Sequence, residues 1–382
     1  MTVASESDSK KDVVVVGGGQ AALALGFYLR RSGLDYVILD EQSRAGGAWQ
    51  HGWKSLRAFS PAQWSSLPGW LMPPAKDGDY PSRDEVISYL TLYESRYALN
   101  VIRGVRVSEV TRSGDEAHPL DVVFDNGGIA ARAVISATGG APFIPELAGR
   151  EDFTGSQLHS VDYSGPADLA GKRVVVVGGG NSGAQIFAEL TEPGSPVSHA
   201  TWATIAPPVF LPDDVDGRYL FEQATARYRA QQEGRIPDPP RSLGDIVMVP
   251  PVKAARDRGD LIAVPMFERL TADGVEWPDG RRSREEVIVW ATGFRPALSH
   301  LESLRVKGTD GRTCVEGAAG TRSCAEPRVW LVGYGDWTGF ASATLIGVGR
   351  SARATIQEVQ SVLAAEVSGF PPHNHPASPD SF

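Results

Sequence analysis

Two short glycine clusters are the residues whose spacing most clearly indicates chemistry. The first, Gly17-x-Gly19-x-x-Ala22, follows an aliphatic run at 13–16 and precedes a segment with helical apolar spacing. In such a turn the first glycine allows a tight bend, the second lets the backbone approach a pyrophosphate, and the small third residue lets helix and strand pack closely. The phosphates then face the N–H groups at the start of the helix. The cluster therefore predicts a dinucleotide site.

An acidic residue is expected at the end of the next strand, where it holds the hydroxyls of a ribose. Asp40 stands there, after the aliphatic segment 37–39 and 23 residues beyond Gly17, and Glu41 follows it. Because strand, glycines, helix and acid are all in place, we prefer a dinucleotide site over a glycine turn that serves packing alone.

A second cluster, Gly178-x-Gly180-x-x-Gly183, repeats the arrangement 161 residues later. Its ribose-binding acid is missing. The next strand is expected at about 201–204, where neither an acid for a ribose hydroxyl nor a cation for a ribose phosphate stands. Ser182 could bind a phosphate. This second site therefore predicts a nicotinamide dinucleotide and leaves the choice between NADH and NADPH open.

Each glycine cluster is followed by a strand that ends in Ala-Thr-Gly, at 137–139 and 291–293. The predicted fold class is therefore α/β, with two Rossmann-like dinucleotide-binding domains, the second inserted in the first. The predicted segments are a flexible tail at 1–11, the first domain at 12–160 and 288–366, the second domain at 161–287, and a flexible tail at 367–382. The chain is expected to cross between the domains at about 153–169 and to return at about 291–296.

The bulk properties limit the partners. The 382-residue chain is 42% hydrophobic and 22% charged, which is typical of a folded globular protein. Its formal net charge of -9 argues against a nucleic-acid partner. The first residues lack the apolar stretch of a signal peptide, and the longest aliphatic runs have only strand length. We therefore expect a cytoplasmic protein that does not bind a membrane.

The two cysteines, Cys314 and Cys324, do not form a C-x-x-C motif, so we expect two structural thiols and disfavour a disulfide reductase. The acidic run 213–216 is interpreted as helix capping and a solvated surface. His373 and His375 lie in the Pro-rich tail and are not taken as metal ligands. No metal site is predicted.

Between the two glycine clusters lies Phe153-x-Gly155-x-x-x-His159-x-x-x-Tyr163. This stretch resembles the signature of the class B flavin monooxygenases, which include the flavin-containing and the Baeyer–Villiger monooxygenases. The glycine clusters, a Gly-Gly-x-Trp at 46–49 and the Ala-Thr-Gly segments also fall in the family's order. The resemblance therefore covers most of the chain.

The resemblance implies FAD in the first domain, NADPH or NADH in the second, dioxygen and a small molecule as substrates, and a homodimer. It also implies that His159 couples cofactor binding to domain movement; a hydrogen-bonded hinge and a catalytic group both stay open for this residue. Gly335-Asp336 would bind the ribityl and pyrophosphate part of FAD. A helix beginning in 341–348 would point its N-terminus at the flavin.

The positions assigned to cofactor binding come from the motifs and from this resemblance. They are Gly17, Gly19, Gln20, Ala21, Asp40, Glu41, Gly47, Trp49, Ser55, Ala137, Thr138, Gly139, Gly178, Gly180, Asn181, Ser182, Gly183, Ala291, Thr292, Gly293 and Asp336.

A narrower resemblance is to the flavin monooxygenases encoded with arsenic-resistance genes. It rests on the stretches YPSRDEVISYL, FLPDDVDGRYLF, GDIVMVPPV and LVGYGDWTGFASATLIGVGR. Two positions depart from the class. Phe59 stands where the class often has an Asn that contacts the reactive flavin oxygen, and Thr204-Ile205-Ala206 stands where related enzymes carry an Arg for the NADPH phosphate.

The predicted function is an FAD-dependent NAD(P)H monooxygenase. It would reduce its flavin by hydride transfer and insert one oxygen atom from dioxygen into a small soft nucleophile or carbonyl compound, with arsenic resistance as the role that the narrower resemblance implies. Phe59 keeps a peroxide-producing NAD(P)H oxidase or flavin reductase open as an alternative. A non-enzymatic dinucleotide redox sensor is the third hypothesis.

Overall fold

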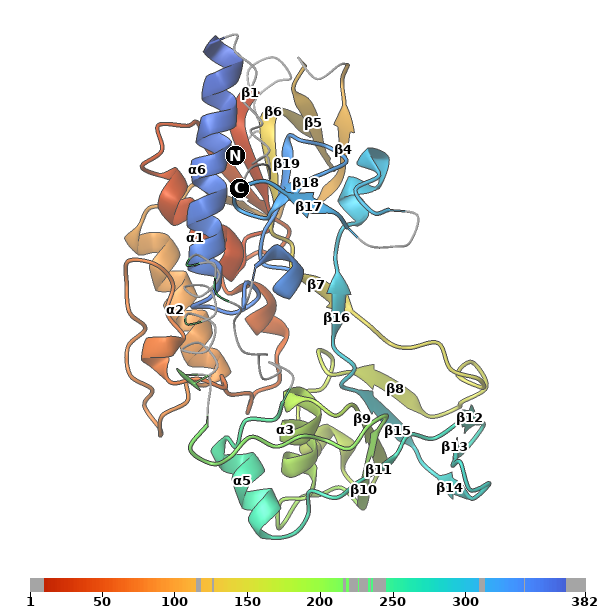
Figure 1. Ribbon diagram of the computed structural model, residues 1–382. Coiled ribbons are helices and arrows are strands. Elements are labelled where there is room, and N and C mark those ends of the chain that lie inside the picture. The colour runs from red at the N-terminus through yellow and green to blue at the C-terminus, as the bar shows by residue number, and fades with distance from the viewer. Residues whose placement is uncertain are drawn as a thin grey trace, which may run out of the picture.

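The computed structural model describes residues 10–114, 118–125, 127–215, 218–219, 226, 233, 235, 245–308, 313–339 and 341–368. Its two largest sheets have nine and five strands. Figure 1 shows the nine-stranded sheet above and the five-stranded sheet below, connected by a pair of extended strands. This is the α/β class with two Rossmann-like units that the sequence predicts.

The larger sheet has the order β17-β18-β19-β6-β1-β2-β3, and β4 joins it through β5, which pairs with β6. Its central strands are parallel and buried on both faces, as aliphatic runs in such sheets are. The strands are β1 (Lys10–Val16), β2 (Tyr36–Asp40), β3 (Val101–Arg103), β4 (Val107–Arg112), β5 (Leu120–Phe124), β6 (Gly127–Ser136), β17 (Val315–Glu316), β18 (Arg322–Ser323) and β19 (Val329–Leu331).

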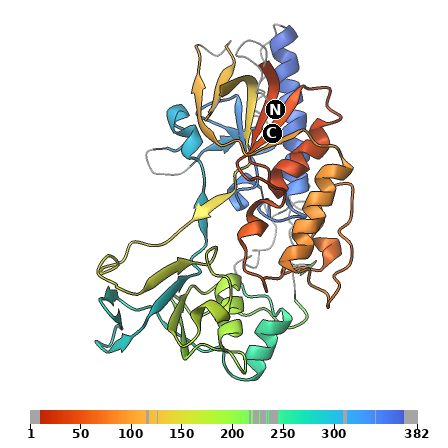
Figure 2. The ribbon, with the colours of Figure 1, turned by 180° about the vertical axis from the view of Figure 1, so that it is seen from behind.

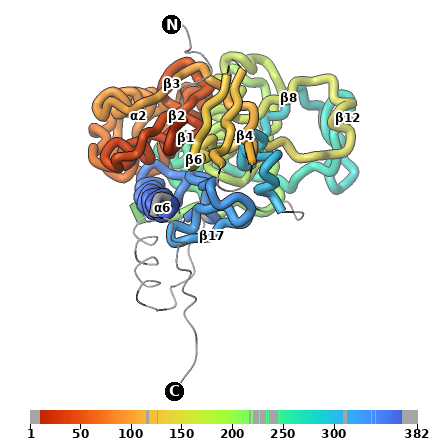
Figure 3. The backbone as a smooth tube through the Cα atoms, turned by 90° about the horizontal axis from the view of Figure 1, so that it is seen from above, coloured from red at the N-terminus to blue at the C-terminus, as the bar shows by residue number. Residues whose placement is uncertain are grey.

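In the part of the chain that the structure describes, three helices accompany this sheet: α1 (Gln20–Leu29), α2 (Arg83–Arg96) and α6 (Val348–Ser368). Helix α6, seen along its axis in Figure 3, buries a stripe at helical spacing that includes Val348, Ala352, Ile356 and Val359. Short 3₁₀ turns complete the unit: η1 (Gly47–His51), η2 (Ala62–Trp64), η4 (Ser299–Leu304) and η5 (Asp336–Thr338).

The smaller sheet has the order β11-β10-β9-β15-β8, and all its pairings are parallel. Its strands are β8 (Ser156–His159), β9 (Arg173–Val177), β10 (His199–Thr204), β11 (Ala263–Pro265) and β15 (Val287–Trp290). Beside it lie η3 (Pro166–Leu169), α3 (Asn181–Leu190), α5 (Pro250–Asp257) and a small antiparallel sheet of β12 (Arg269–Thr271), β13 (Gly274–Glu276) and β14 (Arg282–Arg284).

The chain passes between the two units as a two-stranded antiparallel ribbon. Strands β7 (Gly140–Pro142) and β16 (Phe294–Pro296) pair with each other, and each follows an Ala-Thr-Gly directly. Figure 2 shows both crossings side by side. The return crossing runs through β16.

The first crossing and the boundaries at 160 and 288 differ from the prediction. Strand β8, which the prediction places in the first domain, is already an edge strand of the smaller sheet. Strand β15 lies in that sheet too, between β9 and β8. The physical reason is that the apolar β15 needs a parallel neighbour on each side, and β8 supplies the second.

The helix expected to begin in 341–348 starts at the last residue of that stretch. Residues 341–347 form turns, and α6 begins only at Val348. Ala341 has a positive φ of 59°, and a Cβ atom on Gly347 would lie 2.1 Å from the Ala341 carbonyl oxygen. The backbone is folded too tightly on itself there to enter a helix.

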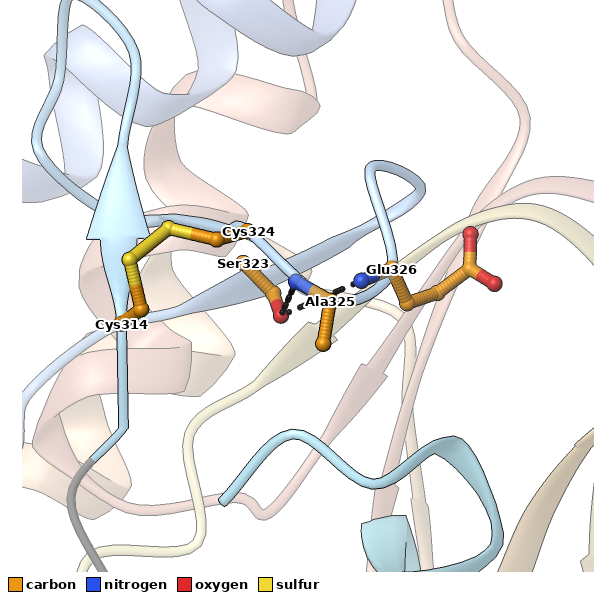
Figure 4. The surroundings of a disulfide bond; sticks show 5 residues. All are labelled: Cys314, Ser323, Cys324, Ala325 and Glu326. Atoms are coloured by element: carbon orange, nitrogen blue, oxygen red, sulfur yellow. Dashed lines mark hydrogen bonds between the residues drawn. A yellow bond between two sulfur atoms is a disulfide. The ribbon is translucent and has the colours of Figure 1, made fainter. Parts of the chain in front are cut away.

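The two cysteines form a disulfide instead of two thiols, as Figure 4 shows. Strands β17 and β18 pair antiparallel, with Val315 opposite Ser323. This register places Cys314 opposite Cys324 with a Cα–Cα distance of 5.5 Å, which is within the reach of a disulfide. The ten-residue separation is therefore the span of a hairpin, a relationship that the spacing alone did not reveal.

Within the described ranges, none of the helices combines the length and the apolar character that a membrane span requires.

Candidate active site

The first glycine cluster lies at the carboxyl end of β1, where the chain turns into α1. Gly17 has a φ of 101°, and a Cβ atom on it would lie 2.6 Å from the carbonyl oxygen of Ala137. Ala137 belongs to the first Ala-Thr-Gly, so the fold brings these two predicted motifs into backbone contact. Only glycine fits this position.

The start of α1 is shaped to hold an anion. Its N-cap is Gly19, none of the described side chains caps it, and its first turn carries no acid. The backbone of Gly47 passes so close that a Cβ atom there would lie 2.6 Å from the Gly19 Cα. The N–H groups of Gln20 and Ala21 begin the helix here, so the cradle fits the pyrophosphate of a dinucleotide.

Asp40 lies at the end of β2, against this cradle. It is buried, and a Cβ atom on Gly18 would lie 2.5 Å from its carboxylate. Arg103 donates hydrogen bonds to Asp40 and to Glu94. Burial raises the pKa of the Asp40 carboxyl, and Arg103 opposes that rise. Sequence reasoning missed Arg103. This cation lies on β3, the strand that pairs in parallel with β2, and the sequence does not show which strands are neighbours.

Glu41, the neighbouring predicted residue, has an exposed side chain 3.8 Å from Arg106. Its role in ribose binding stays a prediction.

Gln20 connects three segments of the first unit. Trp49 Nε1 donates to Gln20 Oε1 (3.1 Å), and Gln20 Nε2 donates to the carbonyl oxygen of Ala343 (2.7 Å). The Gly-Gly-x-Trp stretch and the turns before α6 are therefore both tied to the first residue of α1. Gln20 and Trp49 therefore shape the cradle, and their contact with a cofactor stays a prediction.

A buried polar cluster lies behind the first Ala-Thr-Gly. Tyr334 Oη bonds the hydroxyls of Thr138 (2.7 Å) and Ser136, and Ser136 Oγ bonds His300 Nε2 (3.0 Å). Thr138 also donates to the carbonyl oxygen of Ala297 (2.7 Å). Burial lowers the pKa of His300 to about 4, so the ring is neutral at pH 7. Tyr334 and His300 were not among the predicted residues.

Gly139 follows Thr138 with a φ of 69°, at the entry to β7. Asp336 is the first residue of η5. Its side chain lies outside the described part of the structure, so its contact with FAD stays a prediction.

The second glycine cluster repeats the geometry of the first. Gly178 has a φ of 134°, and a Cβ atom on it would lie 2.2 Å from the carbonyl oxygen of Ala291. A Cβ atom on Gly183 would lie 2.1 Å from the Gly178 carbonyl oxygen. Thr292 Oγ1 donates to the Phe143 carbonyl oxygen, and Gly293 has a φ of 76°. Both Ala-Thr-Gly segments thus stand against a glycine turn and lead into the ribbon.

The start of α3 also fits an anion. Gly180 is its N-cap and, as at α1, no side-chain cap is found in the described chain. The side chain of Asn181 is engaged within the protein: its Nδ2 donates to the Asp245 carbonyl oxygen (3.0 Å) and its Oδ1 accepts from the Val247 N–H (2.9 Å). It anchors the segment before α5, and its part in cofactor binding stays a prediction. Ser182, next along the helix, is half-buried.

The end of β10 is where a ribose phosphate would be discriminated. Thr204 is buried, and Ile205, directly after it, has 93% of its surface exposed. The acidic run that follows is engaged with cations, since Asp213 pairs with Lys253 (2.8 Å) and Arg256. Asp216 lies outside the described residues.

His159 ends β8 with both ring nitrogens occupied. Nε2 donates to the Gly293 carbonyl oxygen (3.0 Å), and the Val161 N–H donates to Nδ1 (3.3 Å). Burial lowers the pKa of His159, which favours this neutral ring. The residue therefore ties β8 to the start of the return crossing. Of the two roles left open, the geometry supports the hinge, and its part in cofactor coupling stays a prediction.

Ser55 and Phe59 face the second unit. The Ser55 hydroxyl lies near the Glu189 carboxyl on α3 and opposes the rise that burial causes in the pKa of that carboxyl, and Phe59 packs against the hydrophobic core of the smaller sheet. The segment that sequence reasoning placed at the flavin is therefore also an interdomain contact.

Two sheets with parallel central strands, each with a glycine-bounded anion cradle, define a flavoprotein with two dinucleotide-binding domains. The sequence pattern of the pyridine nucleotide-disulphide oxidoreductase family matches residues 14–205. A flavin-containing monooxygenase from Stenotrophomonas maltophilia is 50% identical, with a TM-score of 0.83, over 93% of this chain and 100% of that chain.

Two further similarities agree. An uncharacterized oxidoreductase, CzcO-like, from Geobacillus kaustophilus is 28% identical over 76% of this chain and 82% of its own length. A solved cyclohexanone monooxygenase shares the fold, with 20% identity and a TM-score of 0.68 over 95% of this chain and 89% of that chain. The chain belongs to this oxidoreductase family and, within it, to the class B flavin monooxygenases, which are FAD-dependent enzymes.

Proposed function

We propose that the protein is an NAD(P)H-dependent monooxygenase that transfers one oxygen atom from dioxygen to a small soft nucleophile or carbonyl compound. The observation that carries this proposal is the repeated cradle. Gly17 stands against Ala137, and Gly178 against Ala291, each at the ends of parallel strands in its own sheet. One chain therefore offers two pyrophosphate sites, one for FAD and one for the nicotinamide dinucleotide that reduces it.

The protein's own residues would bind and orient the two cofactors and shield them from charge. The N–H groups at the starts of α1 and α3 hold the two pyrophosphates. Gln20 and Trp49 fix the Gly-Gly-x-Trp stretch over the first cradle. The flavin, when bound, supplies hydride acceptance and the reduction of dioxygen. The buried, neutral cluster of Ser136, Tyr334 and His300 keeps charge away from the edge of the sheet behind the first cradle.

The end of β10 indicates little discrimination between NADPH and NADH. Exposed Ile205 offers neither a cation for a ribose phosphate nor an acid for a ribose hydroxyl. We expect kcat/KM for NADPH and NADH to agree within about tenfold, or about 1.4 kcal/mol. A much stronger preference for NADPH would show that a cation elsewhere holds the phosphate.

The soft-nucleophile hypothesis can be tested directly. Purified enzyme with FAD, NADPH and isotopically labelled dioxygen is given thioethers, ketones and, because of the resemblance to arsenic-associated enzymes, a trivalent organoarsenical. Label in the product supports the proposal. Hydrogen peroxide equal to the NADPH consumed, with no labelled product from any compound, contradicts it.

A second candidate function is an NAD(P)H oxidase. It is favoured by Phe59, which packs with the core of the smaller sheet and offers no polar group to a flavin oxygen. The same experiment distinguishes the two functions, because an oxidase releases all its reducing equivalents as peroxide.

A further inference from the structure

The loop at 53–59 leaves the flavin unit and docks on the nicotinamide unit. Trp53 is 5% exposed and belongs to the core of the smaller sheet, which Leu56 and Phe59 also contact. The Trp53 ring packs edge-on against Tyr163, with centroids 6.2 Å apart. Tyr163 is the aromatic residue of the signature that begins at Phe153. The loop is therefore anchored where the signature ends.

Two polar side chains on α3 hold the same loop. Glu189 accepts a hydrogen bond from Tyr163 Oη (3.0 Å), and the nearby Ser55 hydroxyl opposes the rise that burial causes in the pKa of the Glu189 carboxyl. Gln185 is buried, and its Oε1 accepts from the Arg57 N–H (3.4 Å). The two side chains are four residues apart, so they lie on one face of the helix. We call the contacts of Gln185 and Glu189 with the loop and with Tyr163 the α3 latch.

The latch connects the two cofactor cradles by a short path. Its loop follows the Gly-Gly-x-Trp stretch, whose Gly47 contacts Gly19 in the first cradle. Its helix begins at Gly180 in the second cradle. Within the described residues the two units are joined covalently through the ribbon of β7 and β16, and an isolated two-stranded ribbon is marginally stable. Domains joined this way are expected to move unless another contact fixes them.

We propose that Glu189 is a positioning residue for hydride transfer, which holds the loop at 53–59 on α3 and thereby sets the distance between the two cofactors. This inference rests on the proposed function only in that a nicotinamide dinucleotide reduces the flavin. Misplacement of reacting atoms by about 1 Å can cost a factor of about 100 in rate. Loss of the latch therefore slows reduction without weakening either cradle.

The test compares Glu189→Ala, Glu189→Gln and a matched control, Glu192→Ala. Glu192 lies just beyond α3 and is exposed. Glu189→Gln keeps one oxygen that can accept from Tyr163. Each FAD-loaded variant is reduced anaerobically with NADPH, and hydrogen exchange of the peptide covering 53–59 is measured without NADPH.

We expect flavin reduction by Glu189→Ala to be slowed about tenfold or more, with unchanged FAD content and faster exchange of the loop. Glu189→Gln should recover most of the rate, and Glu192→Ala should match the unsubstituted protein. If Glu189→Ala does not fold, Tyr163→Phe removes one arm of the latch and should show a smaller slowing of the same kind.

A rate for Glu189→Ala equal to that of the unsubstituted protein overturns the proposal, as does an equal slowing in Glu192→Ala. Loss of FAD from Glu189→Ala also overturns it, because the residue would then support the first cradle. These outcomes are separate from failure of the proposed function, since reduction is measured without dioxygen or an oxygen acceptor.

Discussion

A Cβ atom on Gly17 would lie 2.6 Å from the carbonyl oxygen of Ala137. Real side chains do not approach a backbone oxygen this closely, so the contact requires glycine at one end and a closely packed parallel strand at the other. The same relationship recurs between Gly178 and Ala291, at 2.2 Å. Each cradle is therefore formed by two motifs far apart in the chain.

Gly17→Ala should weaken FAD binding. Both the positive φ and the collision with Ala137 oppose the substitution, at a cost of about 1–3 kcal/mol for the strain alone. We expect FAD affinity to fall at least about tenfold, measured as bound flavin per protein after titration. Gly33→Ala is the matched control, since Gly33 has a φ of 79° but nothing within 4 Å of a Cβ atom. Equal FAD binding by the two variants would contradict the assignment.

Gly178→Ala should impair the use of NADPH without affecting FAD binding. It should keep FAD, because the first cradle is untouched, yet lose reduction by NADPH at least about tenfold. Reduction by dithionite should stay normal. Gly194→Ala, with a φ of 89° and open space around a Cβ atom, is its control. Loss of FAD from Gly178→Ala would show that the second cradle is not an independent site.

Buried His300 should make the protein less stable in acid. Its pKa falls from 6.5 to about 4 because burial disfavours the charged ring. The neutral form is therefore preferred in the folded state, so its contribution is complete above pH 6.5 and is lost as pH falls toward about 4. This amounts to about 3 kcal/mol of unfolding free energy.

The measurement is urea unfolding across that pH range. His300→Gln should lose less stability in acid than the unsubstituted protein, because the amide does not charge. His51→Gln, at an exposed position, should follow the unsubstituted protein. Parallel pH curves for all three proteins would contradict the role of His300.

Removal of the disulfide should lower stability and spare turnover. Cys314 and Cys324 close a hairpin at the edge of the larger sheet, and a loop of this length contributes about 2–3 kcal/mol. Replacing both with Ser should lower Tm, and a dithiol reductant should lower Tm of the unsubstituted protein equally. NADPH turnover should be unchanged at temperatures where both fold. Loss of turnover would instead make the pair part of the reaction.

Sequence alone determined the features that depend on local order. The glycine turns, the strand before each and the acid at Asp40 follow from backbone geometry and residue spacing, which act within about one βαβ unit. The duplicated pattern likewise determined the two-domain fold, and the signature ending at Tyr163 indicated the class. Each of these features can be recognised from residues that are close together in the sequence.

Tertiary structure decided what joins distant segments. Three features depend on strand order and register, which residue spacing does not reveal. They are the hydrogen bond from Arg103 to Asp40, the place of β8 in the smaller sheet, and the disulfide. The same holds for Ser55, which sequence resemblance assigned to the flavin and which lies near Glu189 on α3. Strand pairing and domain docking depend on burying apolar surface between segments far apart in the chain. Those contacts form only when the whole chain has packed.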